Sequence, residues 1–197
     1  MSSTSLAYLS NNLIYSSLFV FTITFFMHAI ETAWSVRGDE SATRTNVFDR
    51  SKTEKVARIA TALMILGFLL LLAGVIVRGL SAHRVPWGNM YEFSITGALA
   101  FTGAYLAALK KFDLRWLGLP ISIAVLLVLG TAITLLYRPS APLVPALKST
   151  WLVVHVSAAI ISGGVFLLAN TIAATYLILD RMESRGGRNV WAKRLPT

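Results

Sequence analysis

The chain has 197 residues, of which 55% are hydrophobic and only 14% are charged, and its 18 Lys and Arg residues against 9 Asp and Glu residues give a net charge of +9. Soluble domains are closer to 25% charged, so this composition excludes an ordinary soluble domain and indicates a membrane protein. The absence of cysteine excludes disulfides, thiolate metal sites and cysteine nucleophiles, and the Lys/Arg excess is an orientation signal rather than evidence for nucleic-acid binding.

Five stretches contain no charged residue and are long enough, alone or with their flanks, to cross a hydrocarbon layer of about 30 Å as helices. In chain order they are Leu13–Ile30, Ile59–Val77, Phe93–Leu109, Trp116–Leu136 and Trp151–Leu179. The predicted fold class is therefore all-α: a polytopic membrane helix bundle with five transmembrane helices in the lipid bilayer.

Lys and Arg gather on alternate sides of these spans. The loop after the first span, the loop after the third span and the C-terminal tail together hold 14 of the 18 basic residues. The positive-inside rule then predicts an N-terminus outside and a cytoplasmic C-terminus. The expected location is the plasma membrane, as a multi-pass protein. Residues Ala82–Glu92 and Tyr137–Thr150 would share the extracytoplasmic face. Residues Arg37–Lys55 are polar and of mixed charge, which predicts a cytoplasmic linker with little structure of its own.

His28 lies near the predicted cytoplasmic end of the first span. Glu31 follows three residues later and shares the same helix face. We expect an interfacial pair that anchors the helix, and a ligand role for His28 is the less favoured alternative.

The second loop carries the segment His83-Arg-Val-Pro-Trp-Gly-Asn-Met-Tyr-Glu92. Pro-Trp-Gly-Asn is typical of a turn, and the helix dipole favours Glu92 at the start of the third span. A structural role would account for the whole segment. The alternative is that the imidazole of His83 binds a ligand.

Trp151 and His155 are four residues apart at the predicted outer end of the fifth span, so they share one helix face. Tryptophan is a common interfacial anchor at such a position. The imidazole could ligate a metal or a haem iron at the outer surface, and the alternative is a hydrogen bond to a neighbouring helix.

Two segments of the chain resemble the CcsA/ResC branch of the cytochrome c assembly family. Pro145-Ala-Leu-Lys-Ser-Thr-Trp151-Leu-Val-Val-His155-Val-Ser157 is similar to the family's P-A-L-Q-S-x-W-L-x-x-H-V-S. The segment from His83 to Glu92 is similar to G-H-x-P-x-x-N-x-Y-E, with one extra residue between His83 and Pro86. The sequence PWGNMYEF resembles the corresponding segment of the actinobacterial members most.

The resemblance implies the haem-handling membrane component of System II cytochrome c maturation. Its cargo would be haem b, presented on the extracytoplasmic face for covalent attachment to the CxxCH motif of apocytochrome c. The resemblance implies His155 as a ligand of the haem iron, with Trp151 and His83 in the haem-binding site and no assigned catalytic residue. The implied partners are apocytochrome c, a ResB-like membrane protein and a thiol-reducing thioredoxin-like protein, together in a cytochrome c synthase (haem lyase) complex.

The family's tryptophan-rich segment and its second external histidine are absent from this sequence. We expect two parts in the chain. Residues 1–55 would form the first transmembrane helix and the linker. Residues 56–197 would be the N-terminal portion of the assembly domain, to be completed by further sequence or by another chain that supplies the second haem ligand.

Two other classes stay open. One is a haem-free transporter in which Pro120, Gly130 and the Gly163–Gly164 pair mark close helix packing or broken helices. The other is a structural subunit of a membrane complex.

Overall fold

The computed structural model describes residues 2–40, 47–112, 114–139 and 149–184. Within these ranges the chain forms five α-helices and one 3₁₀ turn, and no β-strand. The elements are α1 (Ser3–Glu40), α2 (Val47–Ala82), α3 (Met90–Leu109), η1 (Arg115–Leu117), α4 (Gly118–Thr134) and α5 (Thr150–Ser184). Five helical segments of the described residues, the fourth being η1 together with α4, are long and apolar enough to cross a membrane, which confirms the predicted all-α class and the five candidate spans.

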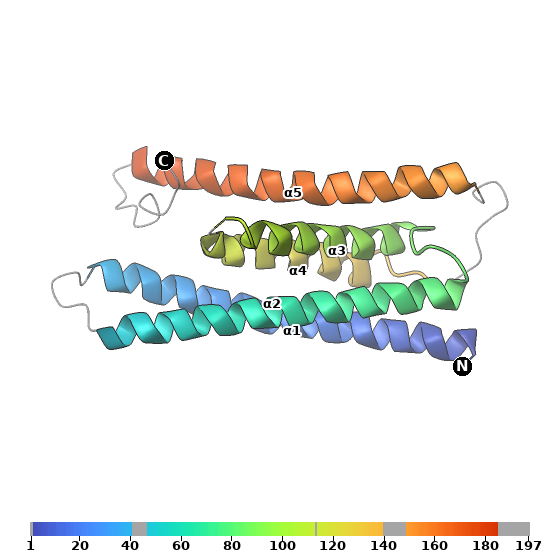
Figure 1. Cartoon of the computed structure of the whole chain (residues 1–197), viewed down its shortest axis with the longest axis horizontal. Coiled ribbons are helices and arrows are strands. Elements are labelled where there is room, and N and C mark those ends of the chain that lie inside the picture. The colour runs from blue at the N-terminus through green and yellow to red at the C-terminus, as the bar shows by residue number, and fades with distance from the viewer. Residues whose placement is uncertain (1, 41–46, 113, 140–148, 185–197) are drawn as a thin grey trace.

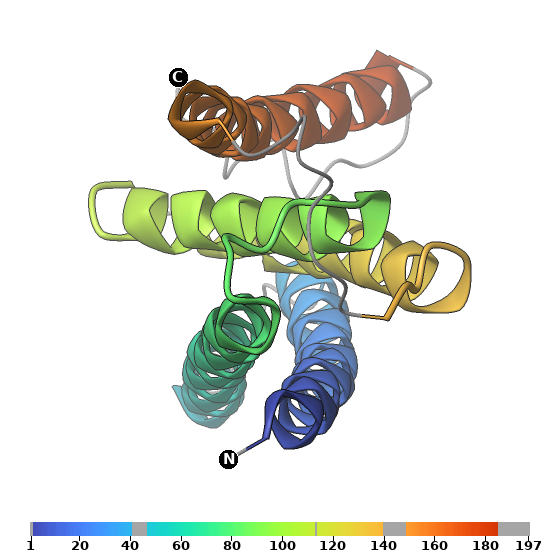
Figure 2. The same ribbon diagram turned by 90° about the vertical axis from the view of Figure 1, so that its right-hand side faces the viewer.

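The helices lie in three layers (Figure 1). α1 and α2 form the first layer, α3 and α4 the second, and α5 alone the third. The second layer crosses the first obliquely, as Figure 2 shows, with α4 packed on α1 and α3 packed on α2. The main neighbour of α5 is α3, so most of the surface of α5 contacts no other described element.

Small residues hold the first layer together. Gly67 and Gly74 of α2 lie against Phe21 and Ile14 of α1, and a Cβ at either glycine would come within 2.8 Å of those side chains. Ser10 donates a hydrogen bond of 2.8 Å from its Oγ to the Gly74 carbonyl. Close backbone approach of this kind is the usual basis of helix packing in a bilayer, where apolar burial between helices adds little.

α5 rests on α3 at Gly164. A Cβ there would lie 2.8 Å from the backbone of Ala100, whereas the adjacent Gly163 has nothing within 4 Å. Of this pair, Gly164 therefore provides the close packing. Neither Pro120 nor the glycine pair breaks its helix, because α4 and α5 are each continuous.

The predicted linker over residues 37–55 is largely helical. α1 continues to Glu40 and α2 begins at Val47, while residues 41–46 lie outside the described residues. The prediction of little structure is wrong for 37–40 and 47–55. Lys, Arg and Glu are good helix formers, so charge ends the apolar window here without ending the helix.

The start of α1, the end of α2, the start of α3, the end of α4 and the start of α5 lie at one end of the bundle, on the right of Figure 1. We call it the loop end, after residues 83–89, which connect α2 to α3 there. The described parts of the two segments predicted to share one face, 82–92 and 137–150, are both at this end.

Candidate functional site

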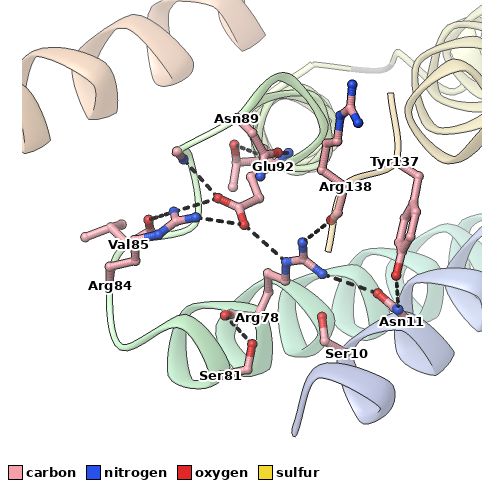
Figure 3. Close-up of polar contacts among 12 residues, drawn as sticks. Ser10, Asn11, Arg78, Ser81, Arg84, Val85, Asn89, Glu92, Tyr137 and Arg138 are labelled. Atoms are coloured by element: carbon pink, nitrogen blue, oxygen red, sulfur yellow. Dashed lines mark hydrogen bonds and ion pairs between the residues drawn. The ribbon is translucent and has the colours of Figure 1, made fainter. Parts of the chain in front are cut away.

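A buried ion cluster lies at the loop end (Figure 3). Its centre is Glu92, in the first turn of α3, whose side chain is fully buried. Arg84 donates from both terminal nitrogens to the carboxylate, over 2.7 and 3.2 Å. Arg78 of α2, only 1% exposed, donates from Nε over 3.2 Å, and the Gly88 N–H donates over 2.9 Å. A charge-assisted network of this kind satisfies a carboxylate that would otherwise be costly to bury.

The local sequence builds this arrangement at the start of α3. Asn89 is the N-cap, and its side-chain oxygen accepts a 2.9 Å hydrogen bond from the Glu92 N–H. Capping fixes the first turn, and the helix N-terminus favours a negative side chain in that turn. The loop therefore presents both the carboxylate and the donors that satisfy it.

Arg78 extends the cluster to the other helices. Its Nη2 donates to the Arg138 carbonyl after α4, and its Nη1 lies 3.5 Å from the Asn11 side-chain oxygen of α1. The guanidinium carbon also lies 5.1 Å from the centre of the Tyr91 ring, a cation–π contact. One arginine thus joins α1, α2, α3 and the segment after α4.

Sequence reasoning missed this cluster. The helix dipole alone accounts for Glu92 in the sequence, and Arg78 lies outside the charge-free windows, where it is not singled out as a partner. A signal was present, because Arg78 directly follows one charge-free window and Glu92 directly precedes the next, with opposite sign. Charges at such positions lie at the same depth when two helices are joined by a short loop.

His83 ends α2. Its φ of 51° is left-handed, the His83 N–H donates to the Leu80 carbonyl, and the Arg84 N–H donates to the Gly79 carbonyl. This pair of bonds is a Schellman motif with His83 at the left-handed position. The imidazole itself is exposed and makes no hydrogen bond to a described residue. The backbone of His83 therefore has a structural role, while its side chain is free.

His155 and Trp151 project from the same face of α5, as predicted. Both are exposed, Trp151 by 82%. Gly164 is nine residues beyond His155, which at 3.6 residues per turn places it on the opposite face. His155 thus points away from α3, and the hydrogen bond to a neighbouring helix predicted as its alternative role is not made within the described part of the chain.

His28 lies at the other end of the bundle, and its predicted pairing with Glu31 is confirmed, with 3.0 Å between Nδ1 and Oε2. The ring packs so closely on α4 that a Cβ at Gly118 would overlap it. The Nε2 is buried and has no hydrogen-bond partner in the described structure. The close contact with Gly118 and the pair with Glu31 favour the anchoring role.

The side chains at the loop end could bind only a few kinds of metal-containing ligand. The described residues contain no group of three or more His, Asp or Glu side chains that could enclose a metal ion. A haem iron takes its equatorial ligands from the porphyrin, so one or two imidazoles are enough. An exposed His155 next to an exposed Trp151 is compatible with that demand.

Comparison with known proteins identifies a family. The model of the family described as "Cytochrome C assembly protein" matches residues 87–195. These residues include Trp151 and His155, and the match begins after His83.

The individual relatives are all named cytochrome c biogenesis protein CcsA. The cytochrome c biogenesis protein CcsA of Picosynechococcus sp. is 34% identical over 115 residues, which are 55% of this chain and 34% of that protein. CcsA of Synechococcus elongatus is 31% identical over 134 residues, 65% of this chain and 41% of the relative. CcsA of the alga Porphyra purpurea is 30% identical over 134 residues, 66% and 41% of the two chains. The matched part of the chain thus spans 34–41% of the length of these relatives.

Proposed function

Because the chain belongs to the cytochrome c assembly protein family, we propose that it handles haem during cytochrome c maturation of the System II type. It receives haem b as cargo and presents it at the loop end for covalent attachment to apocytochrome c. One observation carries the proposal beyond family membership. His155, in the matched region, is an imidazole without a partner in the described structure, on a helix face that no described element covers.

His155 ligates the haem iron in this proposal. Neutral imidazole is the usual proximal ligand of haem iron, and a ligand on an exposed face can meet a porphyrin without rearranging the bundle. Trp151, one turn nearer the helix start, supplies an aromatic surface beside the porphyrin. Its 82% exposure leaves that surface free.

His83 is the second histidine at the loop end and the weaker candidate. Its ring is exposed and free, which supports a place for it at the edge of the haem site. The Arg84–Glu92 ion pair fixes the residue after it, so the loop carries His83 on a well-defined backbone.

The chemistry assigned to this chain is positioning. It has no cysteine, so the thiols come from the CxxCH motif of apocytochrome c. Each S–H adds across one haem vinyl group, the sulfur bonding to one carbon and the proton to the other, and no external oxidant or reductant is consumed. Holding the iron through His155 orients the vinyl groups toward the incoming thiols, which is an advantage of proximity rather than of acid–base catalysis.

We place the loop end on the extracytoplasmic side of the plasma membrane, in accordance with the distribution of basic residues. There the chain meets apocytochrome c, a ResB-like membrane protein and a thioredoxin-like protein that keeps the CxxCH thiols reduced. Residues 56–197 form the assembly-domain portion, and residues 1–55 contribute the first helix and the connection to the second.

The test is haem binding by the purified chain. We expect the wild-type chain to bind haem with the absorption spectrum of imidazole-ligated iron, and His155→Ala to lose most of the haem or change that spectrum. Ser162→Ala is the matched control, because Ser162 is exposed two turns further along the same face of α5. Equal haem content and identical spectra for all three proteins would overturn the assignment of His155.

A further inference from the structure

A cavity of about 480 Å³ lies near the loop end, between α2, α3 and α5. It is separate from the face that carries His155. Among its lining residues are Phe68 and Leu72 of α2, Trp87 of the loop, Leu99 of α3 and Ile160 of α5. Its volume falls in the range of small-molecule binding sites, about 300–1,000 Å³.

The cavity has almost no free hydrogen-bonding group for a water molecule. Three of its lining side chains are polar, those of Trp87, Thr96 and Ser157. Thr96 donates its hydroxyl hydrogen to backbone carbonyls of its own helix, and Ser157 donates to the Val153 carbonyl over 2.6 Å. A buried water molecule needs two to four polar partners, so an apolar occupant is favoured.

The lining residues also exclude a haem-iron site within the cavity. None of them is a histidine, cysteine, methionine, tyrosine or lysine. Ser157, which faces the cavity, is two residues and therefore about 200° around the helix from His155. A haem held by His155 would lie on the other side of α5.

The mouth of the cavity opens between α2 and α5. Two lining residues there, Ile76 and Ile161, are 53% and 62% exposed. Both lie within candidate membrane spans, so the mouth faces the hydrocarbon layer rather than water. The occupant enters sideways, from the bilayer.

The end of the cavity nearest the loop favours a polar, anionic group. The indole N–H of Trp87 is the lining donor that makes no hydrogen bond within the described structure. Next to the lining residue Val85 lies Arg84, and the cluster of Arg78, Arg84 and Glu92 holds two positive charges against one negative charge. Arg78 is buried, but Arg84 keeps 14% of its side chain exposed while it pairs with Glu92, so the excess positive charge of the cluster can attract an anionic lipid head group there.

We propose that this cavity binds an anionic glycerophospholipid from the leaflet at the loop end. One acyl chain fills the space between α2, α3 and α5, and the ester and phosphate groups lie beside Trp87 and the Arg84 side of the loop. The lipid supports α5, whose main neighbour is otherwise α3. This site is independent of haem and of the role of His155.

The experiment measures phospholipid bound to the purified full chain. The chain is extracted in a mild detergent from bilayers of phosphatidylcholine with phosphatidylglycerol, and the lipids that remain are counted by native mass spectrometry. We expect about one phospholipid per chain, enriched in phosphatidylglycerol relative to the bilayer. Leu72→Trp, which places an indole in the cavity, should lower occupancy at least fivefold.

Leu69→Trp is the matched control, because Leu69 is on the same helix, is exposed and does not line the cavity. It should retain the lipid. Equal occupancy in the two variants, no preference for phosphatidylglycerol, or displacement of haem rather than lipid by Leu72→Trp would overturn the proposal.

A second measurement needs no variant. Phosphatidylglycerol with a nitroxide near the end of one acyl chain should give an immobilised component in the electron paramagnetic resonance spectrum of the wild-type chain. Unlabelled phosphatidylglycerol should displace it more effectively than phosphatidylcholine. A spectrum without that component would contradict the proposal even if Leu72→Trp fails to fold.

Discussion

Arg78 near the end of α2 and Glu92 at the start of α3 form an ion pair with side chains 1% and 0% exposed, one helix layer apart. Arg84, a second arginine, donates two further hydrogen bonds to the same carboxylate. The loop end of the bundle is thus fixed by a network that joins four of its five helices or their flanking segments. The fifth, α5, carries His155 at the same end and contributes no residue to the network.

Removing the carboxylate should destabilise the protein strongly. Glu92→Gln leaves Arg78 buried beside a neutral amide, and breaking a buried pair by changing one partner costs about 3–5 kcal/mol. We expect a large fall in the melting temperature of the detergent-solubilised chain.

The nearby variant Ser94→Ala is the control, because the Ser94 hydroxyl is exposed and bonds only its own helix. The double variant Arg78→Met with Glu92→Gln should lose less stability than the two single changes added together. Strict additivity would show that Arg78 and Glu92 do not stabilise each other.

His83 allows its backbone and side-chain roles to be separated. Its left-handed φ costs a non-glycine residue about 1–2 kcal/mol, so His83→Gly should hold or slightly raise the melting temperature. His83→Val places a β-branched residue at the same φ and should lower it. Haem content measured on the stable glycine variant then reports the side chain alone; equal stability of the two variants would refute the capping role.

Gly163 and Gly164 provide a matched pair on α5. Gly164→Leu forces a side chain against the Ala100 backbone and should destabilise the α3–α5 contact by about 1–3 kcal/mol, whereas Gly163→Leu meets open space. Thermal unfolding of both variants checks this. A penalty for Gly163→Leu as large as that for Gly164→Leu would mean that another helix covers the outer face of α5.

The absence of cysteine makes orientation directly measurable, since any introduced thiol is unique. Met90→Cys at the loop end and Lys111→Cys at the opposite end are both exposed positions. In intact cells a membrane-impermeant maleimide should label the first, and should label the second only after permeabilisation. The reverse pattern would invert the proposed topology and remove His155 from the outer face.

The sequence predicted the features that depend on one helix at a time. Five charge-free windows gave five spans, and spacings of three and four residues gave the His28–Glu31 pair and the shared face of Trp151 and His155. Each follows from helical periodicity and the thickness of a bilayer.

Features that depend on how helices pack were harder to predict. The sequence places Arg78 and Glu92 at a similar depth, but whether their side chains meet depends on how α2 and α3 pack. The choice of Gly164 rather than Gly163 as the contact with α3 depends on the rotation of α5 about its axis. The helical extension of α1 to Glu40 was missed because charged residues end a hydropathy window but not a helix.

The central claim is that the imidazole of His155 holds the haem iron, and the most direct measurement is imidazole rescue. His155→Gly should remove the ligand and leave space for free imidazole in its place. Absorption spectra of the ferric haem complex, recorded on this variant before and after imidazole is added, should show loss and then recovery of the wild-type spectrum at the wild-type haem content. A His155→Gly chain that already has the wild-type spectrum without imidazole would contradict the account.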